Sequence, residues 1–409
     1  MKVLVLNCGS SSVKFKLIET EVAQHAADLD RVLAEGTVES IGGPALVRYE
    51  AAGRPPVKET AEVLEHKIAV ERILALLGGG EKPVLSRPED IDAVGHRVVH
   101  GGERFKHSVL IDDEVLSGIE DCFDLAPLHN PPNVRGYRAA RALLAQAPQV
   151  AVFDTSFHQT MPPSAYVYAL PYVLYERHGV RRYGFHGTSH RFVSQRLARR
   201  LGREGDSGLR LITAHLGNGC SVTAIRDGRS VDTSMGFTPL EGLVMGTRCG
   251  DLDPAILGHV AAREELGPAE VTALLNRHSG LLGISGVSGD MRKLLEAEAA
   301  GHERARLAID VFCHRLRKYL AAYVAVLGGV DGIAFAGGIG ENAAPVRART
   351  FAGLEALGLR LDEEKNRDAR GEAEITGSGS QARVFVVPTN EELLIARDTC
   401  RIVSGLAPA

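Results

Sequence analysis

The sequence predicts an α/β protein, because short apolar runs typical of strands alternate with longer stretches of helical periodicity along the chain. Two further observations refine this prediction. A strand, a turn of small polar residues and a second strand follow one another near residue 7, and the same arrangement returns near residue 217. The chain has 409 residues, which corresponds to two or three domains at about 150 residues each.

The composition is that of a globular protein and argues against several classes of function. Lys and Arg number 47 and Asp and Glu 51, so the formal net charge is −4, and 44% of the residues are hydrophobic. A near-neutral chain carries no electrostatic signature of binding to nucleic acid or to an anionic membrane. Aromatic residues are 5% of the chain and Trp is absent, which argues against a base-stacking platform. The 45 glycines exceed the usual share of about 7% and allow close approach of backbone to a ligand.

The cysteines and the N-terminus bear on the cellular compartment. Six cysteines are scattered without a Cys-x-x-Cys pair, which is typical of reduced thiols and not of a zinc site or a disulfide framework. The apolar run at Lys2–Leu6 is too short for a signal peptide. We therefore expect a cytoplasmic protein.

The predicted elements begin with a β-hairpin. Val3–Leu6 is a continuous apolar run, as in a buried strand, and Val13–Ile18 alternates as its partner would. Ala61–Leu77 has helical spacing, and Pro132–Ala145 suits a helix with proline in its first turn. The other elements predicted in this half are strands at Ala93–His100 and Val150–Phe153.

The second half repeats this mixture of elements. A helix is predicted over His190–Leu201, with Thr188 and Ser189 before it as candidate N-caps. Leu211–Leu216 and Ser221–Ile225 are predicted strands, and Asp227-Gly228 is a favourable hairpin turn. The remaining predictions are a long amphipathic helix at Arg304–Leu327, strands at Gly332–Ala336 and Val384–Val387, and a closing helix at Glu391–Val403.

The two strand–turn–strand arrangements have two readings. Val3–Leu6 leads through Asn7–Ser12 into the next strand, and Leu211–Leu216 leads through Gly217–Cys220 into its own partner. Such a repeat indicates two similar domains. The alternative is that glycine turns join hairpins in proteins of every kind, and these residues alone do not separate the two readings.

The glycine-containing turns are candidate phosphate sites. A turn of small residues presents several backbone N–H groups in one direction, and Asn7–Ser12 adds hydroxyl donors, with Lys14 two residues beyond. The dipeptide Gly-Lys of a P-loop occurs nowhere in the chain. Nucleotide binding of the P-loop kind is therefore excluded.

A third glycine turn favours a rival interpretation. Gly338–Ala343 fits the pattern G-x-G-x-x-A, and Asp362 lies about 20 residues further on, as in a dinucleotide-binding dehydrogenase. That fingerprint normally opens a βαβαβ half, whereas fewer than 70 residues follow it here. The dehydrogenase would also leave the paired hairpin turns unexplained.

Two charged residues near predicted strand ends are candidates for chemistry. Arg97 lies in apolar surroundings and could bind a carboxylate or phosphate through two nitrogens. Asp154 ends the strand Val150–Phe153 and could bind Mg²⁺ or orient substrate, although a turn cap is the simpler role. His96 and His100 lie on a strand, where their spacing gives no shared metal geometry, and we interpret them as core or surface residues.

Four further residues have both a functional and a structural interpretation. His186 precedes a helix and could donate to a phosphoryl group, or be structural. Arg248 lies among glycines that would allow close approach to a ligand, or it forms an exposed ion pair. Asp290 could contact a ribose, and Glu391 could bind metal or simply favour the N-terminus of the last helix.

Taken together, five strings resemble the signatures of the acetokinase family, in order and with matching separations, from residue 3 to about residue 403. They are Asn7–Ser12 with Lys14, Gly184–His190, His215–Gly219, Gly337–Asn342 and Thr389–Glu392. The resemblance implies two duplicated ribonuclease H-like domains of the actin, Hsp70 and sugar kinase type, with ATP in a cleft between them. We expect one domain at 1–154 plus 389–409 and a second at 155–388, the second carrying most of the nucleotide site.

The resemblance also implies a role for each matching residue. Asn7 and Glu391 would hold Mg²⁺, for which Mn²⁺ substitutes, and Asp154, His186 and Arg248 would be catalytic. Arg97 would bind the substrate carboxylate, and the methyl group would meet Val99, Leu128, Phe185 and Pro239. ATP or ADP would contact Lys14, His215, Leu216, Gly217, Asn218, Gly219, Asp290, Met291, Arg292, Gly338, Ile339, Gly340, Glu341 and Asn342.

The reaction implied by the family is reversible, direct in-line transfer of the ATP γ-phosphoryl group to acetate, giving acetyl phosphate and ADP, in a homodimer. Acetate resembles a side-chain carboxylate with a pKa of about 4, so at pH 7 it has no proton for a base to remove. We therefore expect Asp154, the family's assigned acid/base, to orient Mg²⁺ or Arg97. Alternatives are a propionate kinase of the same family, and a non-catalytic ATP-driven chaperone or filament protein of the same fold.

Overall fold

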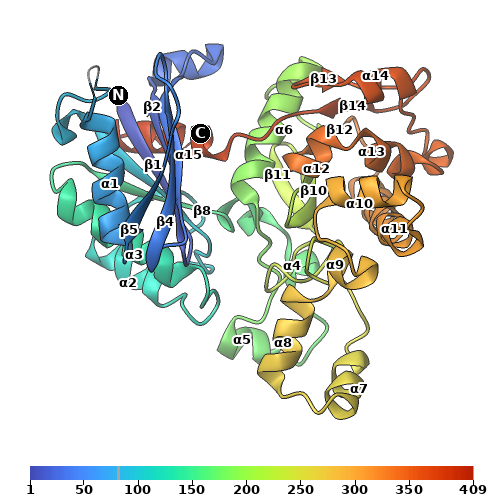
Figure 1. Ribbon diagram of the computed structural model, residues 1–409. Helices are drawn as coiled ribbons and strands as arrows, with labels where there is room; N and C mark the ends of the chain where they lie inside the picture. The colour runs from blue at the N-terminus through green and yellow to red at the C-terminus, as the bar shows by residue number, and fades with distance from the viewer. Residues whose placement is uncertain (81–82, 409) are drawn as a thin grey trace. The chain divides into compact units, whose positions relative to one another are not determined.

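The computed structural model describes residues 1–80 and 83–408, and the chain forms two compact units (Figure 1). Unit 1 comprises residues 1–157 and the C-terminal residues from Asn390 onward, and unit 2 comprises residues 158–389. A short 3₁₀ helix, η3 (Ser156–Thr160), contains the boundary between them. In the part of the chain that the structure describes, we find no helix with the length and apolar character needed to span a bilayer.

Unit 1 is built on an eight-stranded sheet with the strand order β5-β4-β3-β2-β1-β6-β8-β7. Its strands are β1 (Lys2–Cys8), β2 (Ser12–Glu19), β3 (Arg31–Glu39), β4 (Gly43–Ala51), β5 (Val57–Val63), β6 (Ala93–Val98), β7 (Val109–Leu110) and β8 (Gln149–Phe153). Strands β1 to β5 form an antiparallel meander, whereas β1, β6 and β8 run parallel. The carboxyl ends of β1, β6 and β8 therefore meet at one edge.

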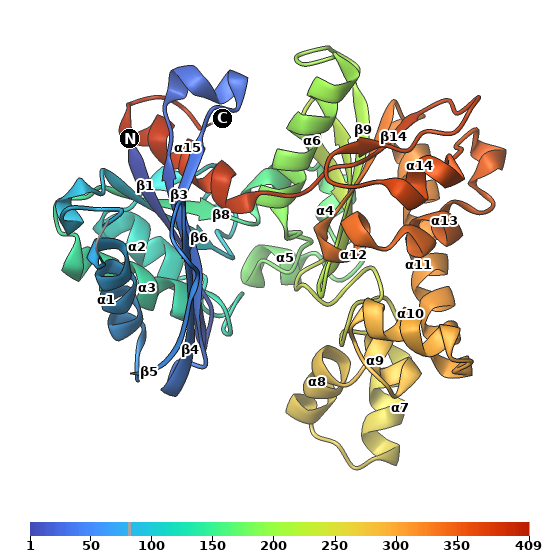
Figure 2. The same ribbon diagram turned by 45° about the horizontal axis from the view of Figure 1, so that its top comes forward.

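Helices cover both faces of this sheet (Figure 1, Figure 2). They are α1 (His66–Gly78), α2 (Asp113–Glu120), α3 (Asn130–Leu143) and α15 (Glu391–Val403), with 3₁₀ helices η1 (Val22–Ala27) and η2 (Pro88–Asp90). Leu4 and Leu6 of β1 pack in a core with α1 and α3, while Val3 and Val5 pack against α15. This alternation is the two-residue period of a strand that is buried on both faces.

Unit 2 has a six-stranded sheet with the strand order β11-β10-β9-β12-β14-β13. Its strands are β9 (Arg210–Leu216), β10 (Cys220–Arg226), β11 (Arg229–Thr233), β12 (Gly332–Ala336), β13 (Ala373–Glu374) and β14 (Arg383–Val386). The turn between β10 and β11 is Asp227-Gly228, and both residues have positive φ (54° and 74°), as a type I′ turn requires. Strands β9, β12 and β14 are parallel.

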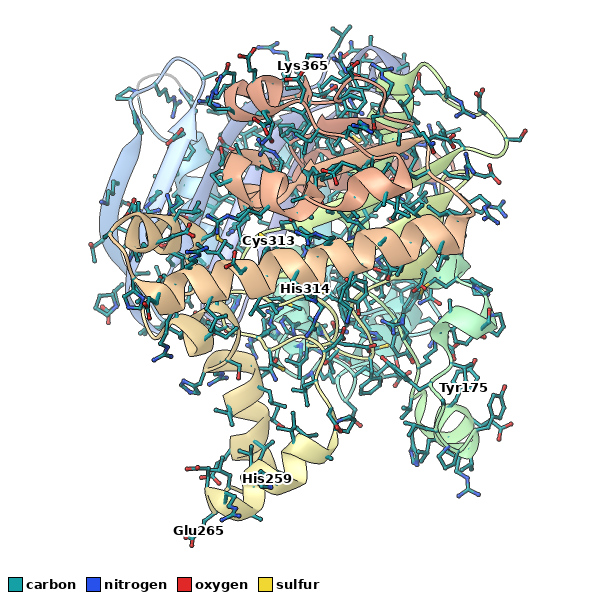
Figure 3. The ribbon with its side chains drawn as sticks, turned by 90° about the vertical axis from the view of Figure 1, so that its right-hand side faces the viewer. Tyr175, His259, Glu265, Cys313, His314 and Lys365 are labelled. Atoms are coloured by element: carbon teal, nitrogen blue, oxygen red, sulfur yellow. The ribbon has the colours of Figure 1, made fainter. Side chains whose placement is uncertain are left out.

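The helices of unit 2 lie between and after these strands. They are α4 (Pro163–Tyr166), α5 (Val173–His178), α6 (Gly187–Leu201), α7 (Ala255–Arg263), α8 (Pro268–Arg277), α9 (Gly280–Ser285), α10 (Met291–Ala299), α11 (Glu303–Leu327), α12 (Gly337–Asn342), α13 (Ala344–Phe351) and α14 (Glu363–Asp368), with η4 (Leu354–Leu357). The long helix α11 is amphipathic: Cys313 is buried, while the next residue, His314, is exposed (Figure 3).

The two sheets share one topology. The order β3-β2-β1-β6-β8 in unit 1 corresponds to β11-β10-β9-β12-β14 in unit 2, an antiparallel meander of three strands followed by two parallel ones. The predicted α/β class with duplicated halves is therefore confirmed. The dehydrogenase interpretation is wrong, because the segment at Gly338, which forms the short helix α12, follows β12, the fourth strand of its unit, and does not open a βαβαβ half.

Several sequence-based boundaries were correct, and two details were wrong. The strand Gly332–Ala336 and the helix Glu391–Val403 have the predicted bounds. The helix predicted from Ala61 begins at His66, because residues 57–63 pair with β4 as strand β5. Thr188 and Ser189 are not caps: α6 begins at Gly187, and its N-cap position is His186, whose side chain does not cap the helix.

Candidate functional site

Five of the predicted site residues of unit 1 lie together where its parallel strands end. Asn7 is near the end of β1 and pairs across the hairpin with Lys14, Arg97 is near the end of β6, and Asp154 directly follows β8. Glu391 is the first residue of α15. The carboxyl edge of parallel strands is the usual location of a site in an α/β fold, because the loops there converge.

Arg97 links this group. Its Nε donates to Oδ1 of Asp154 at 3.1 Å, its Nη2 donates to Oδ2 of the same carboxylate, and its Nη1 donates to Oδ1 of Asn7 at 3.2 Å. An oxygen of Glu391 lies 3.9 Å from Arg97 Nε. Asp154 is 1% exposed and Arg97 22%. The bidentate contact fixes the plane of the guanidinium, and both Asp154 oxygens are occupied by it.

The electrostatics of this group suit a cation. Burial raises the pKa of Glu391 to about 7; Asp154 and Glu392 act in the same direction, while Arg97 and Lys14 oppose it. Burial alone would lower the pKa of Arg97, but Asp154 and Glu391 raise it above its ordinary value, so Arg97 stays charged. The amide oxygen of Asn7 and the carboxylate of Glu391 are hard oxygen donors, which is the ligand type that Mg²⁺ takes.

Hydrogen bonds hold the turn after β1 in place. Gly9 N donates to Ser12 O at 2.8 Å, the Cys8 carbonyl accepts from Asn133 Nδ2 at 2.7 Å, and His66 Nε2 lies 2.8 Å from the Gly9 carbonyl. The contacts with Asn133 and His66 therefore fix the carbonyl groups of Cys8 and Gly9. Sequence reasoning missed Asn133 and His66, because neither belongs to a motif and both are distant along the chain.

In unit 2, His186 has an unusual backbone conformation. Its φ is 56°, the left-handed region, and it follows Gly184 with φ 73°. A Cβ at Gly184 would lie 2.4 Å from Thr233 and 2.7 Å from His158. A non-glycine residue in this region costs about 1 kcal/mol or more, which the surrounding structure must offset. Such a residue at a helix N-terminus is a candidate for function.

The ring of His186 and the guanidinium of Arg248 converge on Gly219. A Cβ at Gly219 would lie 3.2 Å from Arg248 Nη1 and 3.3 Å from both Nε2 and Cε1 of His186. The rings of His186 and His215 lie in contact, with centroids 4.3 Å apart and planes tilted by 30°, and Nδ1 of His186 lies 2.9 Å from Ser221 Oγ. The predicted residues His186, His215, Gly219 and Arg248 are therefore brought together.

Arg248 has no carboxylate partner among the residues that the structure describes. Its Nη1 reaches the Pro239 carbonyl at 3.4 Å and the Met245 sulfur at 3.6 Å. Burial lowers the pKa of Arg248 from its ordinary value. The predicted alternative, an exposed ion pair, is wrong. A half-buried guanidinium without a counter-ion is suited to an anionic ligand.

Two glycine turns lie beside each other in unit 2. Gly217 N donates to Gly219 O at 3.0 Å, and Gly246 N donates to Asn218 O at 3.1 Å. A Cβ at Gly246 would lie 2.4 Å from Asn218 Oδ1, and one at Gly337, where φ is 75°, would lie 2.8 Å from the Leu216 carbonyl. The end of β9 thus carries the turn His215–Gly219, and the end of β12 carries α12, the short helix that contains the predicted turn Gly338–Asn342 with Ile339 and Gly340. Because β9 and β12 are parallel neighbours, both lie at the same edge of the sheet.

The remaining candidates occupy different surroundings. Asp290 is the N-cap of α10, accepting from Arg292 N at 2.9 Å, and pairs with the exposed Arg292 side chain at 2.7 Å. Met291 is buried in the core. Glu341 accepts from Gly337 N at 2.8 Å.

The four predicted methyl-group contacts divide between the units: Val99 and Leu128 belong to unit 1, and Phe185 and Pro239 to unit 2. Val99 and Phe185 are buried, whereas Leu128 is 64% exposed.

Sequence reasoning missed the hydroxyls behind these histidines. Ser221 contacts His186, and Ser189 Oγ lies 2.8 Å from His215 Nδ1 and 2.7 Å from the Thr389 hydroxyl. A signal was present: Thr213 and His215 alternate with apolar residues in β9, as do Ser221 and Thr223 in β10. An alternating polar face within two otherwise apolar strands marks a polar surface inside the fold.

Comparison with known proteins covers nearly the whole chain. The family model described as the acetokinase family matches residues 2–397. An acetate kinase of Solibacter usitatus is 55% identical over 413 residues, covering 99% of both proteins. An acetate kinase of Desulfitobacterium hafniense strain Y51 is 52% identical over 404 residues, covering 98% of this chain and 99% of that protein.

Solved structures agree. The crystal structure of Porphyromonas gingivalis acetate kinase has 47% identity and a TM-score of 0.93, over 98% of this chain and 99% of that one. A propionate kinase from Francisella tularensis has 43% identity and a TM-score of 0.90, over 99% of each chain. Because the family model matches residues 2–397 and relatives more than 50% identical cover almost the whole chain, the chain belongs to the acetokinase family.

Proposed function

We propose that this protein is an acetate kinase, which transfers the γ-phosphoryl group of ATP reversibly to acetate, giving acetyl phosphate and ADP. The observation that carries the proposal is identity of 52% and 55% to proteins named acetate kinase over almost the full chain. The chemistry of the two groups of residues supports it, because phosphoryl transfer between anions depends mainly on positioned charge.

In this proposal Arg97 binds the acetate carboxylate, and Asp154 holds Arg97. Acetate is ionised at pH 7, so no base is needed. Asp154 has both oxygens engaged by Arg97 and is buried, which supports a role in orientation and not in proton transfer. Val99, Leu128, Phe185 and Pro239 remain the proposed contacts of the methyl group.

The proposed metal ligands are Asn7 and Glu391, directly or through water. Their oxygen donors fit Mg²⁺, with Mn²⁺ able to substitute, and a bound cation would neutralise phosphate charge during transfer. Glu391 lies beside Arg97, so the same residue group would handle the metal and the acceptor.

Unit 2 would supply most of the nucleotide contacts. We assign the phosphates to the turn His215–Gly219 with Lys14, and the nucleoside to Asp290–Arg292 and Gly338–Asn342. His186 and Arg248 would donate hydrogen bonds to the phosphoryl group during its transfer. Charged and polar donors of this kind typically contribute about 10²-fold or more to turnover. We also propose that the domain boundaries lie near residues 154 and 389, and that the enzyme is a cytoplasmic homodimer.

A propionate kinase is the second candidate, because a structure with that name matches the chain with a TM-score of 0.90. One additional methylene changes binding in an apolar pocket by only about 1–3 kcal/mol, so the two activities differ in degree. The greater identity to acetate kinases favours acetate as the preferred substrate.

The test is an acyl hydroxamate assay on the purified chain with ATP, Mg²⁺ and acetate, propionate or butyrate in parallel. We expect hydroxamate with acetate at the highest kcat/KM, less with propionate, and none after chelation of the metal. Highest efficiency with propionate would assign the second candidate. No acyl phosphate with any carboxylate would overturn both.

A further inference from the structure

A chain of hydrogen-bonding side chains runs through the polar face behind His186 in unit 2. Thr213 Oγ1 lies 2.7 Å from His190 Nδ1, His190 Nε2 lies 2.7 Å from Ser221 Oγ, and Ser221 Oγ lies 2.9 Å from His186 Nδ1. Thr213, His190 and Ser221 are at most 1% exposed. They come from β9, α6 and β10, so the chain depends on the packing of α6 on the hairpin.

The protons in this chain can be counted. Burial lowers the pKa of His190 well below its usual range, and His158 and His215 act in the same direction, so His190 is neutral and carries one N–H. Each hydroxyl has one proton to donate. The donors and acceptors of these hydrogen bonds can therefore run in only two directions, from Thr213 toward His186 or from His186 toward Thr213.

The two directions differ at Thr213. If donation runs toward Thr213, the threonine hydroxyl accepts from His190, and its own proton has no acceptor, because His190 is its one hydrogen-bond partner in the described part of the chain. A buried hydroxyl whose proton has no acceptor is destabilising, because it loses its hydrogen bond to water and gains none in the fold. If donation runs toward His186, every proton is used. The second direction is therefore favoured.

In the favoured direction Ser221 donates to Nδ1 of His186. A neutral His186 ring then carries its proton on Nε2. That is the ring edge facing Gly219 and Arg248, since Nε2 lies 3.3 Å from the position of a Cβ on Gly219.

We propose that Ser221, with His190 and Thr213 behind it, is a positioning residue that fixes His186 in the Nε2–H tautomer, ready to donate to an anion beside Gly219. The inference rests on the proposed function for the identity of that anion, the transferring phosphoryl group. The assignment of the His186 tautomer itself does not depend on the proposed function. A histidine held in the wrong tautomer loses much of its catalytic effect even where its position is unchanged.

The test uses the full chain and three substitutions. Ser221→Ala removes the hydroxyl next to His186, and Thr213→Val removes the donor at the far end, two hydrogen bonds further away. The matched control is Thr223→Val on the same strand, whose buried hydroxyl lies 2.9 Å from that of Thr233. Long-range ¹H–¹⁵N spectra, assigned by the signal lost in His186→Gln, report the His186 tautomer.

We expect wild type and Thr223→Val to show the Nε2–H form, and Ser221→Ala and Thr213→Val to show a mixture of tautomers. Because a single misplaced donor typically costs at least tenfold, kcat should fall about tenfold or more in Ser221→Ala, with KM for ATP and acetate within about twofold. A wild-type ring protonated on Nδ1 would overturn the proposal, as would equal kinetics for Ser221→Ala and Thr223→Val.

Two outcomes keep this test separate from that of the proposed function. If wild type makes no acyl phosphate, the proposed function fails, while the tautomer spectra still decide the role of Ser221. If Ser221→Ala does not fold, the test relies on Thr213→Val, because this substitution interrupts the series of hydrogen bonds without removing a residue in contact with His186.

Discussion

At the scale of the residue, Arg97 and Arg248 have opposite surroundings. Arg97 is held by Asp154 through two nitrogens and also contacts Asn7, so its plane and position are set before any substrate arrives. Among the described residues, the Arg248 guanidinium forms hydrogen bonds only with a carbonyl and a thioether. In the proposed reaction the first would orient the acceptor, and the second would leave its charge available for the phosphoryl group.

The paired arginine leads to a prediction for Asp154→Asn. The amide keeps the shape of the carboxylate but not its charge, so Arg97 loses a charge-assisted pair worth about 1.5–3 kcal/mol. We expect kcat/KM for acetate to fall roughly 10- to 100-fold, with KM for ATP almost unchanged. Steady-state kinetics with each substrate varied in turn measure both quantities.

The control is Asp112→Asn, which removes the N-cap carboxylate of α2 in the same unit and contacts no candidate site residue. We expect its kinetics to match those of wild type. If Asp154→Asn instead raised the Mg²⁺ requirement alone, Asp154 would act on the metal and not on Arg97.

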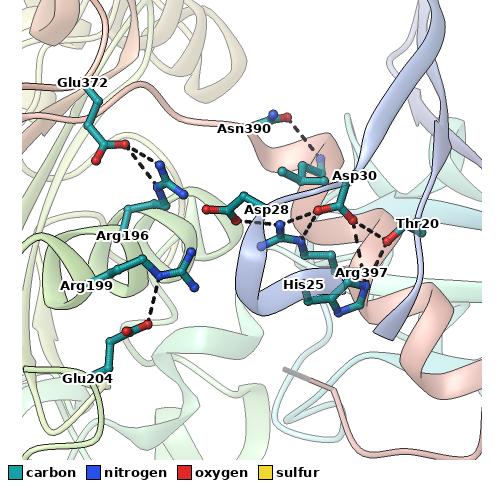
Figure 4. A network of polar contacts seen from close by, with 11 residues as sticks. Thr20, His25, Asp28, Asp30, Arg196, Arg199, Glu204, Glu372, Asn390 and Arg397 are labelled. Atoms are coloured by element: carbon teal, nitrogen blue, oxygen red, sulfur yellow. Dashed lines mark hydrogen bonds and ion pairs between the residues drawn. The ribbon is translucent and has the colours of Figure 1, made fainter. Parts of the chain in front are cut away.

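At the scale of the element, α15 places Glu391 by its packing on the sheet of unit 1. A Cβ at Gly95 of β6 would lie 2.5 Å from Thr399 and 2.7 Å from Ile395, so only glycine allows this approach. Arg397 forms ion pairs with Asp28 and Asp30 in the loop after η1, next to Thr20 and His25 (Figure 4). Because Glu391 begins this helix, its distance to Arg97 depends on these contacts.

We therefore predict that Arg397→Ala destabilises unit 1. The substitution leaves Asp30, whose side chain is 4% exposed, without its cation, and breaking a buried pair costs about 3 kcal/mol or more. Urea unfolding at pH 7 measures the loss. Arg401→Ala, one turn further along α15, removes a hydrogen bond to the Ala407 carbonyl and should cost less than about 0.5 kcal/mol. Equal losses would mean that the pair with Asp30 contributes little.

At the scale of the whole molecule, both units bury histidines, and this makes stability depend on pH. Burial lowers the pKa of His96 in unit 1 and of His158 in unit 2 to about 4, each against an opposing hydrogen bond. A histidine that is neutral in the folded state binds a proton more readily after unfolding. Its stabilising contribution is therefore complete above pH 6.5 and is lost as the pH falls from 6.5 toward 4.

The prediction is that the unfolding free energy falls between pH 7 and pH 5, by about 2 kcal/mol for each such histidine. His96→Gln should reduce this loss by about that amount, because glutamine does not titrate. The control is His259→Gln on the exposed face of α7 (Figure 3), which should follow wild type at both pH values. A His96→Gln protein with the full wild-type pH dependence would contradict the prediction.

How far the sequence leads depends on whether a signal is local. The bounds of β12 and α15 follow from apolar runs and a helix start within a few residues, and the family strings locate the glycine turns. The strand β5 was missed because its apolar residues, Val57, Ala61 and Val63, are few, and the segment forms an edge strand only by pairing with β4. The left-handed His186 was missed because nothing in its own residue type requires that conformation.

By itself the sequence determined the fold class and the residue types at the candidate site, because these depend on periodicity and motifs read along the chain. The duplicated halves, which the two glycine turns left open, were decided by the strand order that the two sheets share. The tertiary structure decided which of those residues act on one another. Arg97 and Asp154 are 57 positions apart and meet because β6 and β8 are parallel neighbours. Ser221 meets His186 and His190 because α6 packs on the hairpin. Such contacts follow from strand order and packing between distant segments, for which no local pattern exists.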